Sequence, residues 1–204
     1  MVVRLWVEGG GDRDALRRVC AMGFRKYVER IVPNSRRMPQ IIPCGGRQEA
    51  YDNFCKALKK PDPNIFDVLL VDAEDLVEPR HAVTPWVHLF KRDRWAQPKG
   101  AVDDQAQLMV VTVDAWLVAD PEALASRYKK GFREKALPTA SDLEQVPKAD
   151  LYKALEAATK DTTSGPYGKS DAFHLLGVID PARVEARCKR LAPRLHAFIR
   201  ANCG

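Results

Sequence analysis

The chain has 204 residues, of which 46% are hydrophobic and 29% are charged. These fractions are ordinary for a globular domain, so they exclude disordered and collagen-like classes. Lysine and arginine outnumber the acidic residues by 33 to 27, which gives a formal net charge of +6. A mildly basic balance of this size is compatible with a polyanionic partner such as nucleic acid.

No segment of the chain is typical of a membrane protein or an exported protein. The longest runs that are nearly all apolar, residues 66–71 and 108–113, are far shorter than the roughly 20 residues of a membrane span. The N-terminus lacks the pattern of a signal peptide. The five cysteines are odd in number and have no CxxC spacing, which argues against disulfide frameworks and structural zinc. We therefore expect a cytoplasmic protein without membrane contact.

Strand and helix patterns alternate in the first half of the chain. Asp12 has the position and residue type of a helix cap, and the run at 66–71 is apolar enough for a strand buried on both faces. Alternation of this kind predicts an α/β fold with a mostly parallel sheet, flanked by helices and joined by right-handed crossovers. The expected elements are strands at 2–7, 40–44 and 66–71 and helices at 13–30 and 47–59.

The second half begins with loops and becomes helical. The patterns predict a fourth strand at 108–113, a possible short strand at 86–90, and helices at 121–128, 149–159, 171–176 and 182–201. We expect an α/β core at 1–128 and a helical extension at 129–204, packed together as one unit. Most of the net positive charge lies in residues 121–204, where 15 basic residues outnumber 10 acidic ones, whereas residues 1–120 hold 18 basic and 17 acidic residues.

Acidic residues follow two of the predicted strands. Glu8 ends the first strand and precedes three glycines, and Asp72 and Glu74 follow the buried strand at 66–71. Ligands of open α/β sheets bind outside the carboxyl ends of the strands, and residues two apart in extended backbone point the same way. Three carboxylates at one edge would repel one another. A divalent cation such as Mg²⁺ relieves that repulsion, although polar residues at strand ends are also common in ordinary turns.

These motifs resemble the TOPRIM fold of topoisomerases, bacterial primases and OLD-type nucleases. Glu8 matches the TOPRIM glutamate, and Asp72 and Glu74 match its Asp-x-Asp motif, with a glutamate in the second place. Asp75 takes that place if the backbone turns there. The resemblance implies a TOPRIM or Rossmann-like core that holds Mg²⁺ or Mn²⁺ on these acids.

Most of the chain is also similar to a small bacterial family described as domain of unknown function 4276. This resemblance implies a partner ATPase of the AAA or ABC type in a phage-defence system. It is carried by Val7–Asp12, Cys44–Arg47, Leu70–Asp75, Gly100–Met109, Ala115–Leu124 and Pro147–Asp150.

Two further acids flank the predicted fourth strand. Asp104 precedes it and Asp114 follows it, and either would complete a second metal position, since two-metal phosphodiesterases draw acids from several strands. The alternative for Asp104 is a helix cap, and the alternative for Asp114 is a polar residue at a strand end.

Several residues are candidates for holding a phosphate. Gly9 and Gly10 allow a ligand close to the backbone, and Arg47 stands at a predicted helix start after two glycines, where phosphates bind. Lys148 and Lys169 lie in predicted loops, where a lysine neutralises the charge of a phosphoryl transition state. The alternative for Arg47 and for both lysines is an ordinary surface position.

Other patterns exclude competing chemistry. Gly168–Ser170 is not a P-loop, because position 163 is threonine where that motif needs glycine, and the four histidines lack zinc-protease spacing. Trp86 and Trp95 enclose three basic residues, a mixture that either stacks bases or packs a loop.

The sequence therefore predicts a Mg²⁺- or Mn²⁺-dependent nuclease that acts on DNA or RNA. The alternative is a non-catalytic adaptor for a partner ATPase, and a primase-like transferase is a third possibility. The sequence leaves the oligomeric state open.

Overall fold

The computed structural model describes residues 1–204 and contains a sheet of four strands, all parallel. The strand order is β2-β1-β3-β4. The chain therefore winds one way from β1 to β2 and the other way from β3 onward, which makes the β1–β3 boundary the topological switch point of the sheet. The mostly parallel α/β sheet expected from the sequence is confirmed. The strands are β1 (Val2–Val7), β2 (Gln40–Pro43), β3 (Ile65–Asp72) and β4 (Ala106–Met109).

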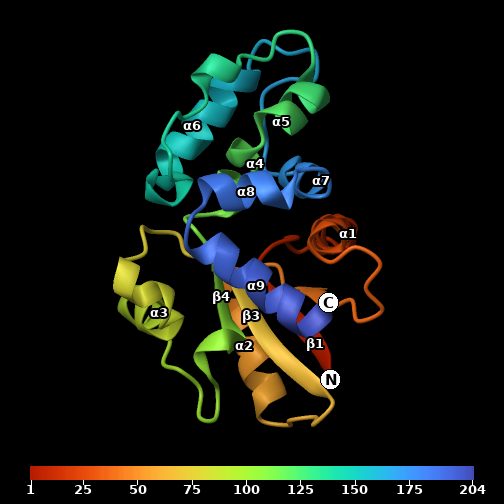
Figure 1. The fold of residues 1–204 in the computed structure, drawn as a ribbon, viewed down its shortest axis with the longest axis vertical. Helices are drawn as coiled ribbons and strands as arrows, with labels where there is room; N and C mark the ends of the chain where they lie inside the picture. The colour runs from red at the N-terminus through yellow and green to blue at the C-terminus, as the bar shows by residue number, and fades with distance from the viewer.

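Helices cover both faces of the sheet (Figure 1). Helices α1 (Asp14–Ile31) and α9 (Leu191–Cys203) pack on one face, and α2 (Arg47–Leu58) and α3 (Pro85–Asp93) pack on the other. Helix α1 turns Cys20, Phe24, Tyr27, Val28 and Ile31 inward, a spacing of three and four residues that gives a helix one apolar face.

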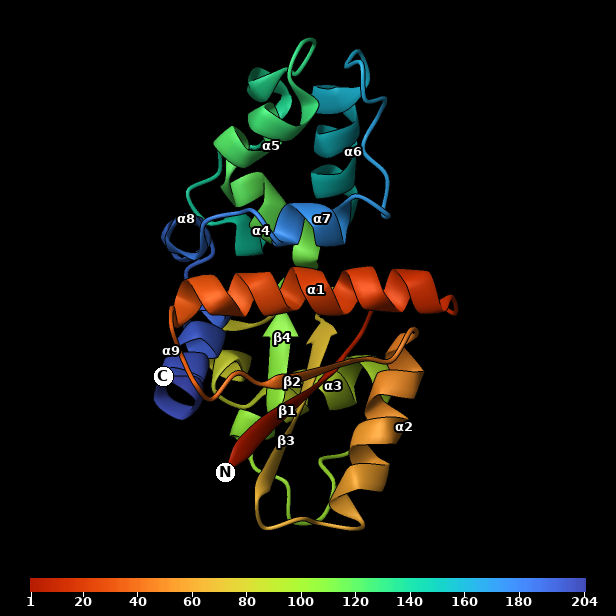
Figure 2. The same cartoon turned by 90° about the vertical axis from the view of Figure 1, so that its right-hand side faces the viewer.

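The remaining helices form a group beyond the carboxyl edge of the sheet, toward which the arrowheads of β3 and β4 point (Figure 2). This group shares one apolar core with the sheet. Trp116 stacks on Tyr27 of α1 with ring centroids 5.3 Å apart. The group consists of α4 (Val113–Ala119), α5 (Pro121–Tyr128), α6 (Lys148–Thr159), α7 (Ala172–Leu176) and α8 (Pro181–Arg187).

The division of the chain differs in detail from the expected boundary after residue 128. Helices α4 and α5 lie with the helical group, before that boundary, whereas the C-terminal helix α9 returns to pack on β4. The carboxyl edge of the sheet is therefore covered by the segment between α4 and α8, residues 113–187, which lies on both sides of the expected boundary.

Two predicted strands need correction. Residues 86–90 belong to helix α3, which begins with Pro85 at its first position, where proline favours a helix. The fourth strand is shorter and earlier than expected, at Ala106–Met109. Thr112 ends the extended segment because its side chain accepts a hydrogen bond from the Asp114 N–H at 3.0 Å and caps α4.

Two predictions about helix ends were also wrong. Asp12 does not cap α1, whose first residue is preceded by Arg13 without a side-chain cap. The single helix expected at 182–201 is two helices, α8 and α9. The buried carboxylate of Glu144 starts α9 by accepting hydrogen bonds from the N–H groups of Arg190, Leu191 and Ala192 at 2.9–3.1 Å.

The longest helix, α1, has 18 residues. Neither it nor any other helix combines the length and apolar character of a membrane-spanning segment.

Candidate metal centre and pocket

Two acidic residues lie at the switch point of the sheet. Glu8 directly follows β1, and Asp72 is the last residue of β3. The Glu8 N–H donates to the Leu70 carbonyl at 2.9 Å, and the Asp72 N–H donates to Oε2 of Glu8 at 3.1 Å. The sheet pairing itself therefore holds these two carboxylates side by side.

Glu74 joins them through a turn of the backbone. Residues 72–74 do not stay extended, because Glu74 has a φ of +67°, a left-handed conformation that is uncommon outside glycine and is often found at functional sites. One carboxylate oxygen from each of Glu8, Asp72 and Glu74 lies within 4.8 Å of the other two. The expected cluster of three acids is present, although a turn and not strand alternation assembles it. We call these three residues the acidic cluster.

Lys148 is the cation nearest to Glu74. Its Nζ lies 2.6 Å from both carboxylate oxygens of Glu74, and Arg92 adds a weaker contact at 3.8 Å. Lys148 starts helix α6, so this ion pair links the helical group to the end of β3. The prediction that Lys148 lies in a loop was wrong, because Lys148 begins helix α6, and in this structure its partner is Glu74.

Arg47 donates hydrogen bonds to two carboxylates and one backbone carbonyl. Its Nη1 donates to Glu8 at 3.1 Å and to the Asp72 carbonyl, while Nε and Nη2 donate to Asp93 at 3.0 and 2.6 Å. Its guanidinium also lies 4.9 Å from the centre of the Trp95 ring. Four of the five N–H donors of Arg47 are thus engaged within the chain, so Arg47 fixes the position of Glu8 and keeps only one Nη2 hydrogen for a ligand.

Burial and mutual repulsion disfavour the charged forms of two cluster members. Burial is the largest cause that raises the pKa of Glu8 from its ordinary value, opposed mainly by the nearby Arg47. The pKa of Asp72 is raised well above its ordinary value, first by burial and then by the negative charges of Glu8 and Asp114. A group of carboxylates held in this state is stabilised by an added cation.

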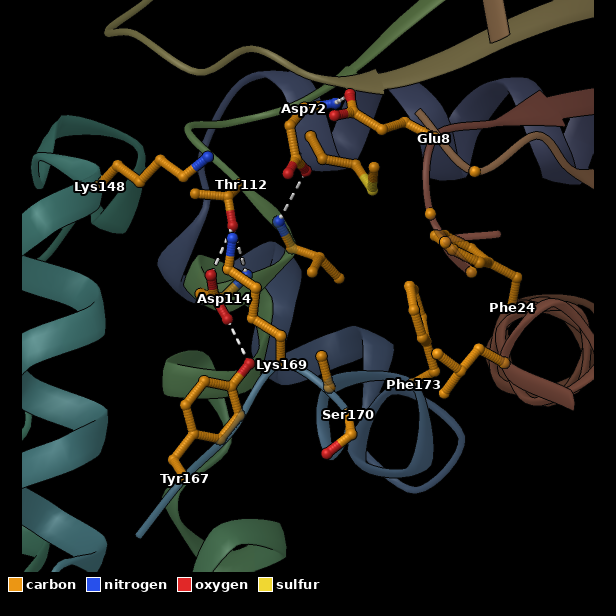
Figure 3. Close-up of a pocket in the computed structure, with 18 residues that line it drawn as sticks. Glu8, Phe24, Asp72, Thr112, Asp114, Lys148, Tyr167, Lys169, Ser170 and Phe173 are labelled. Carbon is orange, nitrogen blue, oxygen red and sulfur yellow. Dashed lines mark hydrogen bonds between the residues drawn. The ribbon is translucent and has the colours of Figure 1, made fainter. Parts of the chain in front are cut away.

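A cavity of about 440 Å³ opens beside the acidic cluster (Figure 3). Its walls come from the glycines after β1, the ends of β3 and β4, the start of α4, and the helical group. The site therefore lies between the carboxyl edge of the sheet and the helices that cover it, where ligands of such sheets bind.

Asp114 lines the cavity as a buried, hydrogen-bonded acid. Its carboxylate accepts hydrogen bonds from Thr112 Oγ1 at 2.8 Å and from the Tyr167 hydroxyl. Asp114 is close enough to raise the pKa of Asp72 but is not among the three clustered acids. Tyr167 was not among the predicted site residues; it stands two residues before Lys169.

Lys169 is the free cation of the cavity. It is exposed, lines the cavity, and forms no ion pair, and Figure 3 shows its side chain extending toward Thr112 and Asp114. Gly9 and Gly10 also line the cavity, with φ of +135° and +87°. The Gly9 N–H already donates to the Gly45 carbonyl at 2.9 Å.

Several predicted site residues lie elsewhere. Asp104 is at the amino end of β4, opposite the cluster, and pairs with Arg194 at 3.2 Å. Asp75 is 74% exposed and lies 3.6 Å from Arg92. Trp86 and Trp95 are buried, so they pack the fold and do not stack bases.

The donor set of the acidic cluster suits a hard cation. Mg²⁺ and Mn²⁺ favour carboxylate oxygens, and the cluster offers three of them without a competing cysteine or histidine. Two Mg²⁺–oxygen bonds span up to about 4.2 Å, so oxygens within 4.8 Å of one another nearly match one coordination shell. The residues present therefore fit such an ion.

A family model matches most of the chain. The family model for Domain of unknown function (DUF4276) matches residues 7–199. The chain belongs to this family. The matched segment of this DUF4276 member includes the acidic cluster, Lys148 and Lys169. No curated protein and no solved structure matches the chain significantly, so the TOPRIM resemblance still rests on the acidic motifs.

Proposed function

We propose that this protein is a Mg²⁺- or Mn²⁺-dependent nuclease that hydrolyses phosphodiester bonds of DNA or RNA. The observation that carries the proposal is the position of the acidic cluster. Three carboxylates lie together at the switch point of a parallel sheet, and two of them, Glu8 and Asp72, line a cavity that Lys148 and Lys169 also line. Acids that hold a cation beside lysines that attract a phosphate form the arrangement that phosphodiester hydrolysis needs.

Each residue has a distinct role in the proposed reaction. Glu8, Asp72 and Glu74 would hold the cation, which when bound supplies a Lewis acid and an activated water. Glu8 is also the candidate proton acceptor, because its carboxylate lines the cavity beside the position proposed for the cation. A water oxygen forms a bond to phosphorus and gives its proton to Glu8, the bond to the leaving oxygen breaks, and the leaving oxygen takes a proton from solvent water.

The lysines act on the substrate. Lys169 has no partner within the chain and is placed to bind a phosphate oxygen. Lys148 shares its charge between Glu74 and the cavity. Positive charge at these positions stabilises the negative charge that develops on the phosphoryl oxygens.

The experiment is a cleavage assay with labelled single-stranded and duplex DNA and RNA, in Mg²⁺, Mn²⁺ or EDTA. Glu8→Gln and Asp72→Asn should each abolish cation-dependent cleavage while the fold is retained by circular dichroism. Asp52→Asn, an exposed acid on α2, serves as the matched control and should cleave normally. Cleavage that survives both site variants would show that the activity lies elsewhere.

A second candidate function is that of an adaptor for a partner ATPase, as in a phage-defence system. Two observations favour it. Arg47 and Lys148 already provide counter-ions for Glu8 and Glu74 within the chain. Helix α3 and the turn before it expose Val83, Val87 and Phe90. A stable complex with the ATPase, without Mn²⁺ binding by the isolated chain in calorimetry, would favour the adaptor.

A further inference from the structure

The cavity has two chemically different sides. Lys148, Lys169 and Asp114 line one side, and the acidic cluster reaches into the cavity through Glu8 and Asp72. Leu16, Phe24 and Phe173 line the opposite side. We call these three residues the apolar wall; Figure 3 shows its two aromatic rings across the cavity from Lys148 and Asp114.

The apolar wall begins one residue from the acidic cluster. A Cβ atom on Gly9 would lie 2.6 Å from Cζ of Phe173, so the absence of a side chain at Gly9 lets this ring lie against the backbone that follows Glu8. The rings of Phe173 and Phe24 are 6.1 Å apart and tilted by 46°. The half-buried ring of Phe173, backed by the buried ring of Phe24, therefore stands within one residue of the proposed site of hydrolysis.

A ligand that fills this cavity has a charged part and a flat or apolar part. A volume of about 440 Å³ is at the lower end of the range for small-molecule sites, about 300–1,000 Å³. One nucleotide fits such a space, whereas a base pair within a duplex does not. Enzymes with pockets of this kind accept a base only after it has left the stack, and they hold it against aromatic and apolar side chains.

We infer that the apolar wall seats a single unstacked base of a single-stranded nucleic acid, while the adjoining phosphate lies between the acidic cluster and Lys169. This inference rests on the proposed nuclease function and names its substrate class. None of the three wall residues carries a hydrogen-bonding side chain, so the base is held by stacking and shape. Recognition of this kind tolerates all four bases.

The test compares oligonucleotides that differ only in their bases. Binding of a 12-nucleotide oligo-dT, an abasic oligomer with the same number of phosphates, and a blunt duplex is measured by fluorescence polarisation, with Ca²⁺ in place of Mg²⁺. Stacking on one aromatic ring contributes about 1–3 kcal/mol, so the abasic oligomer should bind at least about fivefold more weakly than oligo-dT. The duplex should also bind more weakly than oligo-dT.

Two variants locate the effect on the apolar wall. Phe173→Leu keeps an apolar side chain against Gly9 but removes the aromatic face, and Leu16→Gln alters a wall residue that is already 37% exposed. Both should reduce oligo-dT binding toward the abasic level and leave abasic binding unchanged. Phe90→Leu, at an exposed phenylalanine on α3, should change neither.

The outcomes separate this inference from the nuclease proposal. Equal binding of oligo-dT and the abasic oligomer, with cleavage that still depends on Glu8 and Asp72, would overturn the base seat and leave the nuclease standing. Base-dependent binding that Phe173→Leu removes, without any cation-dependent cleavage, would support the seat and overturn the nuclease. Tight binding of the duplex would overturn the proposed base seat. So would a failure to bind any of the three oligonucleotides.

Discussion

Nζ of Lys148 lies 2.6 Å from both carboxylate oxygens of Glu74, although the two residues are 74 positions apart in the chain. The contact ties helix α6 to the end of β3 directly over the cavity. Lys148 therefore has two opposed effects on the proposed site. It occupies oxygens that a cation would use, and it brings positive charge to the place where a phosphate would lie.

Replacing Lys148 with methionine should separate these two effects. Mn²⁺ affinity, measured by isothermal titration calorimetry, should rise because Glu74 loses its competing partner and the site loses a positive charge. Cleavage should fall by about 10-fold or more, because one cation near the phosphate is removed. Lys153→Met, on the exposed face of the same helix, should change neither quantity. Weaker Mn²⁺ binding in Lys148→Met would contradict this account of the ion pair.

Asp72→Asn should stabilise the protein in the absence of divalent cations. The carboxylate of Asp72 is destabilised by burial and by its acidic neighbours, and asparagine can keep the hydrogen bond that Oδ1 accepts from the Val113 N–H at 3.0 Å. A gain of about 1 kcal/mol raises Tm by about 2–4 °C in a domain of this size. The measurement is thermal unfolding at pH 8 in EDTA and in Mg²⁺. The variant should unfold at higher temperature than wild type in EDTA and should lose the increase in Tm that Mg²⁺ gives to wild type.

The pH dependence of stability follows from the raised pKa values of Glu8 and Asp72. The folded protein holds these protons more tightly than the unfolded chain, whose carboxyl groups titrate near 4.5 for Glu and 3.8 for Asp. Stability contributed by the protonated forms is therefore present at acidic pH and is lost as pH rises through the folded pKa values. In EDTA, Tm should fall across this range, more steeply in wild type than in Asp72→Asn. Mg²⁺ should offset this fall in Tm. If Tm fell equally steeply with pH in wild type and in Asp72→Asn, the raised pKa of Asp72 would not be the cause.

The positions of Glu8 and Asp72 were predictable because they depend on local patterns. An apolar run that ends in a carboxylate marks the end of a buried strand, and parallel strands bring such ends to one edge. Glu74 was predicted to join Asp72 because extended backbone would point both side chains the same way. The prediction of the residue holds but its reason was wrong, since the left-handed backbone of Glu74 turns it toward the cluster. Helix α3 was missed although Pro85 is a usable signal for a helix start.

Long-range contacts explain what could not be predicted. The break between α8 and α9 depends on Glu144, which caps α9 from 47 residues away in the chain. The role of Arg47 as a counter-ion depends on Asp93, and the burial of Asp114 depends on Tyr167. The two residues of each contact are far apart in the sequence, at no spacing that helix periodicity, strand alternation or a known motif would indicate. These contacts could therefore not be predicted from the sequence.

Glu144 should be one of the most important polar residues for stability. Its carboxylate is fully buried and accepts the three N–H groups that begin α9. Glu144→Ala leaves these groups without an acceptor and should lower the free energy of unfolding by about 2–4 kcal/mol. Urea unfolding followed by circular dichroism measures the loss. Glu156→Ala, an exposed position on α6, is the control; a similar small effect for both variants would rule out the capping role.

Gly23 should control how α7 docks on α1. A Cβ atom at position 23 would lie 2.2 Å from the carbonyl oxygen of Phe173, so alanine would force the two helices apart. Alanine favours a helix over glycine by about 1 kcal/mol, yet we expect Gly23→Ala to destabilise the protein by about 1–3 kcal/mol through overpacking. Gly168→Ala, whose Cβ would have 3.8 Å of space, is the control for thermal unfolding. A more stable Gly23→Ala protein would contradict the close packing of these helices.

The central claim is that Glu8, Asp72 and Glu74 hold a divalent cation. The most direct measurement is a crystal structure of the full chain in Mn²⁺, with diffraction data collected at the manganese absorption edge. We predict an anomalous peak among the three carboxylates, with Lys148 moved away from Glu74, and no such peak in Asp72→Asn crystals. The account would be contradicted if Mn²⁺ bound elsewhere in the crystal at full occupancy while no peak appeared among these carboxylates and Lys148 stayed paired to Glu74.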